Sequence, residues 1–153
     1  LLAFLGSYNS FRAAHLGMKS ILDVESLSDN VSTLMGHNDP AVYDKESGTV
    51  AVVAGNKEYS NCCTVVHEMA HAIAYSSQLH QDKWLIDAHK RLFDKLCPYL
   101  QGGMPGDPHG YNELFAESVA ALLLSGERNL RKWTDDAYVD WLKASLSKLG
   151  GPK

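Results

Sequence analysis

Two histidines, His67 and His71, lie four positions apart, and a glutamate, Glu68, directly follows the first of them. On a helix this spacing places both imidazoles on one face, one turn apart. Imidazoles in that arrangement can bind one Zn²⁺ at the usual zinc–nitrogen distance of about 2.0–2.1 Å. The Glu68 carboxylate is offset by about 100° around such a helix, so it would reach a metal-bound water instead of the metal. The pattern therefore predicts a catalytic zinc site with Glu68 as the general base.

The residues around this pattern are strongly apolar, both at 64–66 before it and at 72–74 after it. Two histidines can share a helix face by chance, which would leave two polar side chains on a buried helix. Each buried polar group without a partner costs roughly a few kcal/mol. A metal ion and its bound water would supply those partners, so we favour the metal site over the chance pair.

A catalytic zinc ion needs a third protein ligand and an open fourth position. Glu113 and Glu117 are again four positions apart, in a segment that holds no lysine between Tyr111 and Ser125. Paired glutamates are often solvated carboxylates on a helix surface, but such residues usually lie among lysines. We therefore expect one glutamate to bind the metal. The other would accept the free N–H of a ligand histidine and so fix its tautomer.

These residues carry a resemblance to a known family. An HExxH motif followed by a helix with a ligand glutamate resembles the gluzincin class of zinc metallopeptidases. Within that class, the run at residues 112–117 is similar to the corresponding segment of the group typified by the anthrax lethal factor catalytic domain. The resemblance covers residues 49–121.

The resemblance implies which residue plays which part. His67, His71 and Glu113 would bind the one catalytic Zn²⁺, and Glu68 would be the general base. Glu117 would then be the carboxylate that hydrogen-bonds with a ligand histidine.

One position departs from the family pattern. The lethal factor group has a catalytic tyrosine seven residues before its ligand glutamate, where this chain has Gly106. Tyr111 and His109 are close by in the sequence, and either could donate a hydrogen bond to the developing oxyanion. Both also have an ordinary structural interpretation, Tyr111 as a half-buried anchor and His109 as a loop residue. We expect Tyr75 to lie in the core.

The four other histidines, His15, His37, His80 and His89, have no ligand spacing, and we expect at least three of them to face solvent. His37 lies in a turn-rich run and could border a cleft. The three cysteines, at positions 62, 63 and 97, lack C-x-x-C spacing, so neither a zinc knuckle nor a disulfide framework is predicted. We expect the cysteines to be buried as small hydrophobic residues.

The elements that must position the site indicate an α+β fold. Two apolar segments at 41–44 and 49–54 flank a turn at 45–48 and predict a β-hairpin. Helices are predicted at 8–22, 61–78, 82–97, 111–125 and 135–149, with a flexible loop at 101–108. Residues 21–27 could instead begin a strand. With the resemblance, the expected architecture is zincin-like. It has a small twisted sheet with an edge strand, for which 49–54 is the candidate, over the helix with the histidine pair. A helical C-terminal half follows.

Composition sets limits on domain number and partners. The chain has 153 residues, 45% hydrophobic and 21% charged, and no break divides it, so we expect one domain over 1–153. A net charge of −4 without a lysine or arginine run disfavours a nucleic-acid partner. No apolar stretch is long enough for a membrane span. The short apolar start at 1–5 does not fit a signal sequence, and we expect a catalytic domain excised from a longer chain.

Three functions are consistent with these residues. The favoured one is a zinc-dependent endopeptidase that hydrolyses peptide or protein substrates. The second is a catalytically silent zinc-binding recognition module, against which the intact Glu68 argues, because a binding module needs no base. The third is a helical interaction domain with an accidental HExxH pattern. By analogy with the lethal factor group, a secreted, toxin-like protein is expected.

Overall fold

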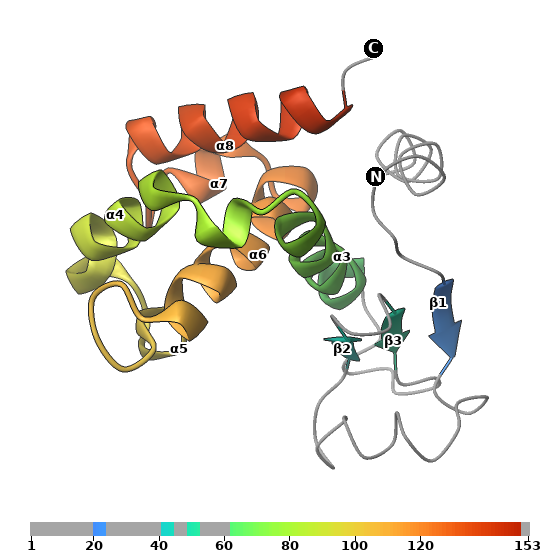
Figure 1. The fold of residues 1–153 in the computed structure, drawn as a ribbon. Helices are drawn as coiled ribbons and strands as arrows, with labels where there is room; N and C mark the ends of the chain where they lie inside the picture. Colours follow the sequence, from blue (N-terminus) through green and yellow to red (C-terminus); the bar gives the residue numbers. More distant parts are fainter. Residues whose placement is uncertain (1–19, 24–40, 45–48, 53–61, 151–153) are drawn as a thin grey trace.

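The computed structural model describes residues 20–23, 41–44, 49–52 and 62–150 (Figure 1). This described part is mostly helical, and its helices follow its strands in the sequence. The strands are β1 (Ser20–Asp23), β2 (Ala41–Asp44) and β3 (Thr49–Val52). The helices are α3 (Cys62–Ser76), α4 (Lys83–Leu92), α5 (Pro98–Gln101), α6 (Pro108–Leu124), α7 (Glu127–Leu130) and α8 (Asp136–Gly150). Short 3₁₀ helices at Leu79–Gln81 and Phe93–Lys95 flank α4.

The three strands are ordered β1-β3-β2, so β3 lies in the middle. β1 runs parallel to β3, with Ser20 opposite Thr49, and β2 runs antiparallel to it, with Ala41 opposite Val52. The prediction that 49–54 forms the sheet edge is therefore wrong, because β3 is the central strand of the described sheet and β1 and β2 are its two edge strands. The hairpin pattern specifies only one neighbour of β3, whereas its second neighbour comes from a distant segment. β1 also replaces the expected end of the helix at 8–22, whose first residues lie outside the described part.

Helix α3 lies between the sheet and the other helices (Figure 1). The helix predicted at 61–78 is confirmed over Cys62–Ser76. Its buried side chains include Met69, Ala70, Ile73 and Ala74, and it contacts β2 and β3 as well as α6. A helix that is apolar around most of its circumference must be covered on several sides, which explains its central place.

Helix α6 is the second central element, and it starts earlier than predicted. The Asp107 side chain accepts from the backbone N–H groups of His109 and Gly110, and Pro108 occupies the first turn. An aspartate cap followed by proline is a strong helix start, so the helix extends three residues beyond the predicted beginning at 111. At its other end Gly126 has φ 81°, as expected for the residue after a helix.

The segment between α4 and α6 is more broken than predicted. The helix expected over 82–97 ends as α4 at Leu92, and a 3₁₀ turn follows it. Pro98 does not simply stop a helix, because it begins the short helix α5 at residues that were expected to lead into a loop. Helix α7 was also not predicted. Short helices of one turn have too few residues to show a periodic pattern.

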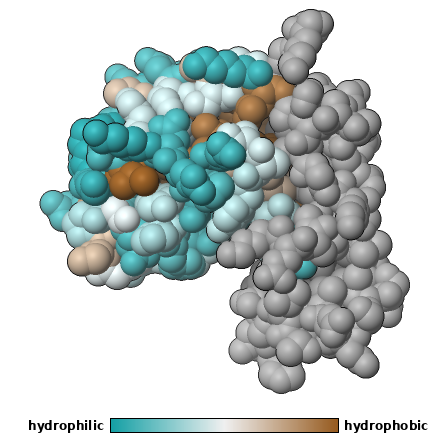
Figure 2. All heavy atoms as spheres, in the orientation of Figure 1, coloured by the Kyte–Doolittle hydropathy of each residue, from teal (hydrophilic) through white to brown (hydrophobic). Residues whose placement is uncertain are grey.

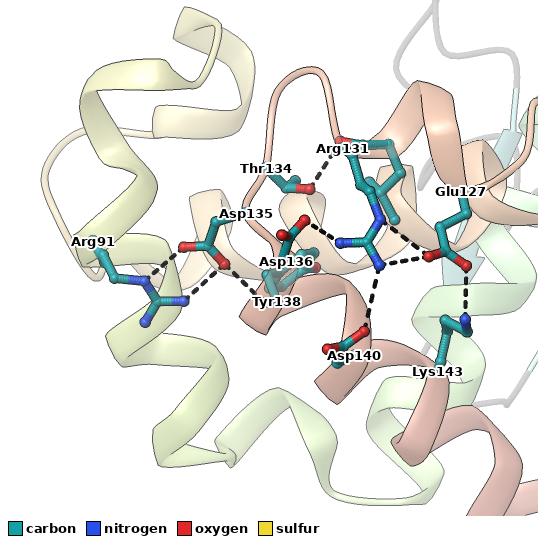
Figure 3. A network of polar contacts seen from close by, with 10 residues as sticks. Arg91, Glu127, Arg131, Thr134, Asp135, Asp136, Tyr138, Asp140 and Lys143 are labelled. Carbon is teal, nitrogen blue, oxygen red and sulfur yellow. Dashed lines mark hydrogen bonds and ion pairs between the residues drawn. The ribbon is translucent and has the colours of Figure 1, made fainter.

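An ion-pair network joins α7 to α8 (Figure 3). The Arg131 guanidinium contacts the carboxylates of Glu127, Asp136 and Asp140, and Lys143 contacts Glu127 as well. The Glu127 carboxylate is shared by Arg131 and Lys143 and so links α7 to two sides of the network.

A second contact docks α4 on the start of α8. Arg91 Nε lies 2.8 Å from Asp135 Oδ2, and the Arg91 guanidinium lies over the Trp84 ring. Trp84 stacks on Trp141 at a centroid distance of 4.9 Å and on the buried Tyr138. These aromatic contacts pack α4 against α8.

The visible described surface in Figure 2 is largely hydrophilic, with small apolar patches. None of the described helices is long and apolar enough to cross a membrane. The prediction that the cysteines are buried is wrong for Cys97, which is exposed at the start of α5. Among the four other histidines, His89 is wholly buried. His80 is half-buried, while His15, His37 and the side chains at 62 and 63 lie outside what the structure describes.

Candidate metal centre

Three buried side chains from two helices converge on one point. His67 and His71 come from α3 and Glu113 comes from α6. The Nε2 atoms of the two histidines are 3.0 Å apart. Glu113 Oε2 lies 3.1 Å from His67 Nε2, and Glu113 Oε1 lies 3.4 Å from His71 Nε2. Donor atoms around a tetrahedral zinc ion are separated by about 3.4 Å. The group could therefore hold a metal ion.

The close approach of α3 and α6 brings these donors together. Ala70 and Ala74 of α3 are buried, as are Ala116 and Ala120 of α6, and the two helices contact each other extensively. Helix axes come closest where the side chains between them are small. The i, i+4 spacing places the two histidines on one face of α3, and this packing places Glu113 opposite them.

Glu117 lies behind one of the histidines. Its Oε1 atom is 3.1 Å from His67 Nδ1, on the opposite side of the ring from the Nε2 atom that faces Glu113. The contact is at ion-pair distance and lacks the alignment of a hydrogen bond, but a carboxylate this close favours a proton on Nδ1, which leaves Nε2 for a metal. The sequence pattern left open which glutamate joins the histidines, and the structure places Glu113 among them and Glu117 behind His67.

The electrostatics of the centre favour a positive charge. Burial alone would lower the pKa of His67, but the close carboxylates of Glu113 and Glu117 raise it to about 10. Burial opposes ionisation of Glu113, yet the hydrogen bonds from His67 and His71 outweigh it and lower the pKa of that carboxyl well below its usual range. A proton or a metal cation satisfies the same preference, because both neutralise the buried carboxylate.

Glu68 lies beside the three donors without being one of them. Burial raises the pKa of its carboxyl, while the nearby charges of His71 and His67 act in the opposite direction. The backbone amide of Tyr43 hydrogen-bonds with this carboxylate. Because Tyr43 belongs to β2, the edge of the sheet reaches the same region as the general-base candidate.

Tyr99 is the residue at the centre that the sequence did not reveal. Its hydroxyl donates to Glu113 Oε2, and its side chain is 51% exposed. Burial and this hydrogen bond raise the pKa of the phenol, so the hydroxyl keeps its proton. Tyr99 is therefore a proton donor that reaches both solvent and the centre. In the sequence only Pro98 pointed to this region, because a proline can begin a helix, and the short helix that Pro98 begins carries Tyr99.

The two predicted donors lie in different places. His109 Nδ1 is 3.7 Å from Glu113 Oε1, its side chain is exposed, and its ring stands against the ring of Tyr99. Tyr111 packs on the core and its ring meets that of His89. The structure thus places His109 at the edge of the centre and Tyr111 away from it, in the anchoring position.

His89 connects the segment that carries Tyr99 to α4. Its Nε2 atom lies 2.9 Å from the Leu100 carbonyl oxygen, and the Gly106 N–H donates to its Nδ1 atom at 3.0 Å. Since Nδ1 accepts, the hydrogen must be on Nε2, which donates to Leu100. A Cβ at Gly110 would lie 2.6 Å from His89 Nε2, so only glycine fits against the ring. One buried side chain therefore holds both ends of the loop between α5 and α6.

No protein-family model, curated protein or solved structure matches this chain. What the site can do chemically therefore follows from its own geometry. That geometry combines two imidazoles and a carboxylate that could hold a cation, a further carboxylate beside them and a phenol at solvent. Groups of these kinds can take part in metal-assisted hydrolysis.

Proposed function

We propose that this chain is a zinc-dependent endopeptidase of the gluzincin type with a zincin-like fold. The observation that supports it most is the convergence of His67, His71 and Glu113 with Glu68 next to them. Two histidines and a glutamate, with the fourth position left for water, form one of the common ligand sets of catalytic zinc. Structural zinc sites instead use four protein ligands, mostly cysteines.

Each residue of the proposed site has a separate role. His67, His71 and Glu113 would hold the ion, and Glu117 would orient His67 through Nδ1. When bound, zinc supplies a Lewis acid and a water molecule whose pKa is close to neutral. Glu68 takes the proton of the attacking water and later delivers it to the leaving amine. The place of Glu68 beside the three donors, without being one of them, suits both steps, because the carboxylate must reach the water and then the leaving amine.

Tyr99 is the proposed donor to the oxyanion. Its phenol keeps its proton and is partly exposed beside the centre, and its one O–H, which donates to Glu113 here, would turn to the substrate oxygen. A donor at that position stabilises the charge that develops as the carbonyl becomes tetrahedral. It would replace the family tyrosine, whose position is occupied here by Gly106. His109 is the neighbour that borders the same space.

Strand β2 is the proposed support for an extended substrate. It is an edge strand, and its residue Tyr43 touches Glu68 through the backbone. A peptide can add to such an edge through main-chain hydrogen bonds, which hold it without regard to its sequence. β2 replaces β3, which the sequence suggested for this role, because β3 has a neighbouring strand on each side.

The test separates metal binding from catalysis. Purified protein is dialysed, its zinc content is measured, and cleavage of a random peptide library is followed by mass spectrometry. One equivalent of zinc and cleavage are expected for the wild type. Glu68→Gln should keep the zinc and lose cleavage by about 10²–10⁴-fold. Asp94→Asn, a matched change at an exposed position, should retain both.

Cleavage by Glu68→Gln at the wild-type rate would refute the mechanism. Bound zinc without cleavage in the wild type would favour the catalytically silent zinc-binding module.

A further inference from the structure

A pocket of about 580 Å³ lies between α5, α6 and α7. Its volume is within the range of roughly 300–1,000 Å³ that is typical of ligand sites. Much of its lining is apolar and comes from Leu96, Leu100, Ala120, Ala121 and Trp133. Leu96, Leu100 and Ala120 are buried, so the walls are part of the packed interior and keep their shape.

The pocket adjoins the candidate metal centre through two shared side chains. Tyr99 lines it and donates to Glu113, and Glu117 lines it and contacts His67. A group bound in the pocket is therefore separated from the donors by only one side chain. This continuity distinguishes the pocket from a hollow elsewhere on the surface.

The chemistry of the lining indicates what would fill it. The alanines at 120 and 121 leave space where larger residues would close the pocket. Its one carboxylate, that of Glu117, already contacts His67. Lys95 and Asn129 also belong to the lining and offer N–H donors that suit peptide carbonyl groups. The pocket thus combines apolar walls with donors for a main chain, which fits an uncharged side chain carried by a peptide.

We propose that this pocket binds one bulky apolar side chain, such as leucine, methionine or phenylalanine, next to the scissile bond of a peptide substrate. The inference rests on the proposed peptidase function and specifies its substrate class. Moving such a side chain out of water favours a peptide by roughly 10- to 100-fold over one with alanine there.

The first experiment measures binding without cleavage. Zinc-loaded Glu68→Gln protein is titrated with blocked peptides that differ at one position, which carries leucine, phenylalanine, alanine or aspartate. The signal is tryptophan fluorescence, since Trp133 lines the pocket and Trp84 and Trp141 stack on each other elsewhere. Leucine and phenylalanine peptides should bind roughly 10- to 100-fold more tightly than the alanine peptide. The fluorescence change should disappear in Trp133→Phe.

The second experiment fills the pocket. Ala121→Phe should remove the preference for bulky apolar residues, both in peptide binding and in the cleavage profile. Ser125→Phe reduces the volume of the same pocket. Because Ser125 is exposed, this variant leaves the core intact. Ala144→Phe, an exposed position on α8, is the matched control and should keep the preference.

The outcomes separate the two proposals. Equal affinity for all the peptides, or a preference that survives both filled variants, would overturn the pocket assignment while leaving the peptidase intact. A wild-type protein that binds apolar peptides selectively but cleaves none would overturn the peptidase and support the pocket as a peptide site.

Discussion

The Tyr99 hydroxyl donates a hydrogen bond to Glu113, although the two residues lie 14 positions apart and on different helices. Helix α5, which is a single turn, brings the phenol to the carboxylate. A hydrogen bond to α4 holds this short helix in place. The carbonyl of Leu100, the residue after Tyr99, accepts from the buried His89 ring. The proposed donor is thus positioned by a contact that has no counterpart in the HExxH pattern.

Replacement of Tyr99 by phenylalanine tests the proposed oxyanion donor. Tyr99→Phe removes one hydroxyl and should lower kcat by about 10²–10³-fold, the usual effect of removing one such donor. Zinc should stay bound, because the three proposed ligands are unchanged. Tyr111→Phe removes the same group from a core-packed position and should leave kcat unchanged. Loss of activity in Tyr111→Phe but not in Tyr99→Phe would reverse the assignment.

Replacement of Glu117 by glutamine tests the support of His67. The amide cannot hold the Nδ1 proton as a carboxylate does, so Glu117→Gln should weaken zinc binding by about 10–100-fold. Competition with a chromophoric chelator measures the affinity. Glu127→Gln makes the same change on α7, in the ion-pair network with Arg131, and should leave the affinity unaltered. Equal zinc affinity in the wild type and Glu117→Gln would show that the negative charge beside His67 Nδ1 does not contribute to zinc binding.

Replacement of His89 tests the attachment of the loop between α5 and α6. His89→Leu leaves the Leu100 carbonyl and the Gly106 N–H without their partner, at a cost of about 1–3 kcal/mol for each buried group. Urea denaturation should show a lower free energy of unfolding. His89→Gln can still donate to Leu100 and should lose less. If both variants lost the same amount, the hydrogen bond to Leu100 would have no separate role.

The contact between Asp135 and Arg91 should make the free energy of unfolding depend on pH. The hydrogen bond with Arg91 lowers the pKa of the Asp135 carboxyl in the folded protein. The unfolded chain therefore binds protons more readily, with a pKa of about 3.9. Stability from this group is present above that pH and is lost as the pH falls through the lower folded-state pKa. The free energy of unfolding of Asp135→Asn should accordingly decline less than that of the wild type between neutral and acidic pH.

The same residue also allows its two contacts to be separated. Asp135 accepts from the Tyr138 N–H at the start of α8, in the manner of a helix cap. Asparagine is a good cap and alanine is not, so Asp135→Ala should lose about 1 kcal/mol more than Asp135→Asn at pH 7. Thermal unfolding at several pH values measures both effects. A stability of Asp135→Ala equal to that of Asp135→Asn would exclude the capping contribution.

The local pattern of the sequence was enough to predict the donors that share a helix. His67 and His71 lie on one face of α3, and Glu113 and Glu117 lie one turn apart on α6, because helical periodicity fixes the relation between residues four positions apart. The same periodicity located α3, most of α8 and the apolar part of α6. In each case the information is contained within a few turns of chain.

Relations between distant segments needed the tertiary structure. The packing of α3 against α6 decided that Glu113 faces both histidines and that Glu117 lies behind His67. The pairing of β1 with β3 placed β3 in the middle of the described sheet and left β1 and β2 at its edges. The buried ring of His89 and the break after Leu92 brought Tyr99, instead of Tyr111, to the centre. Such contacts join residues whose separation along the chain carries no periodic signal, and only the packing of the whole core determines them.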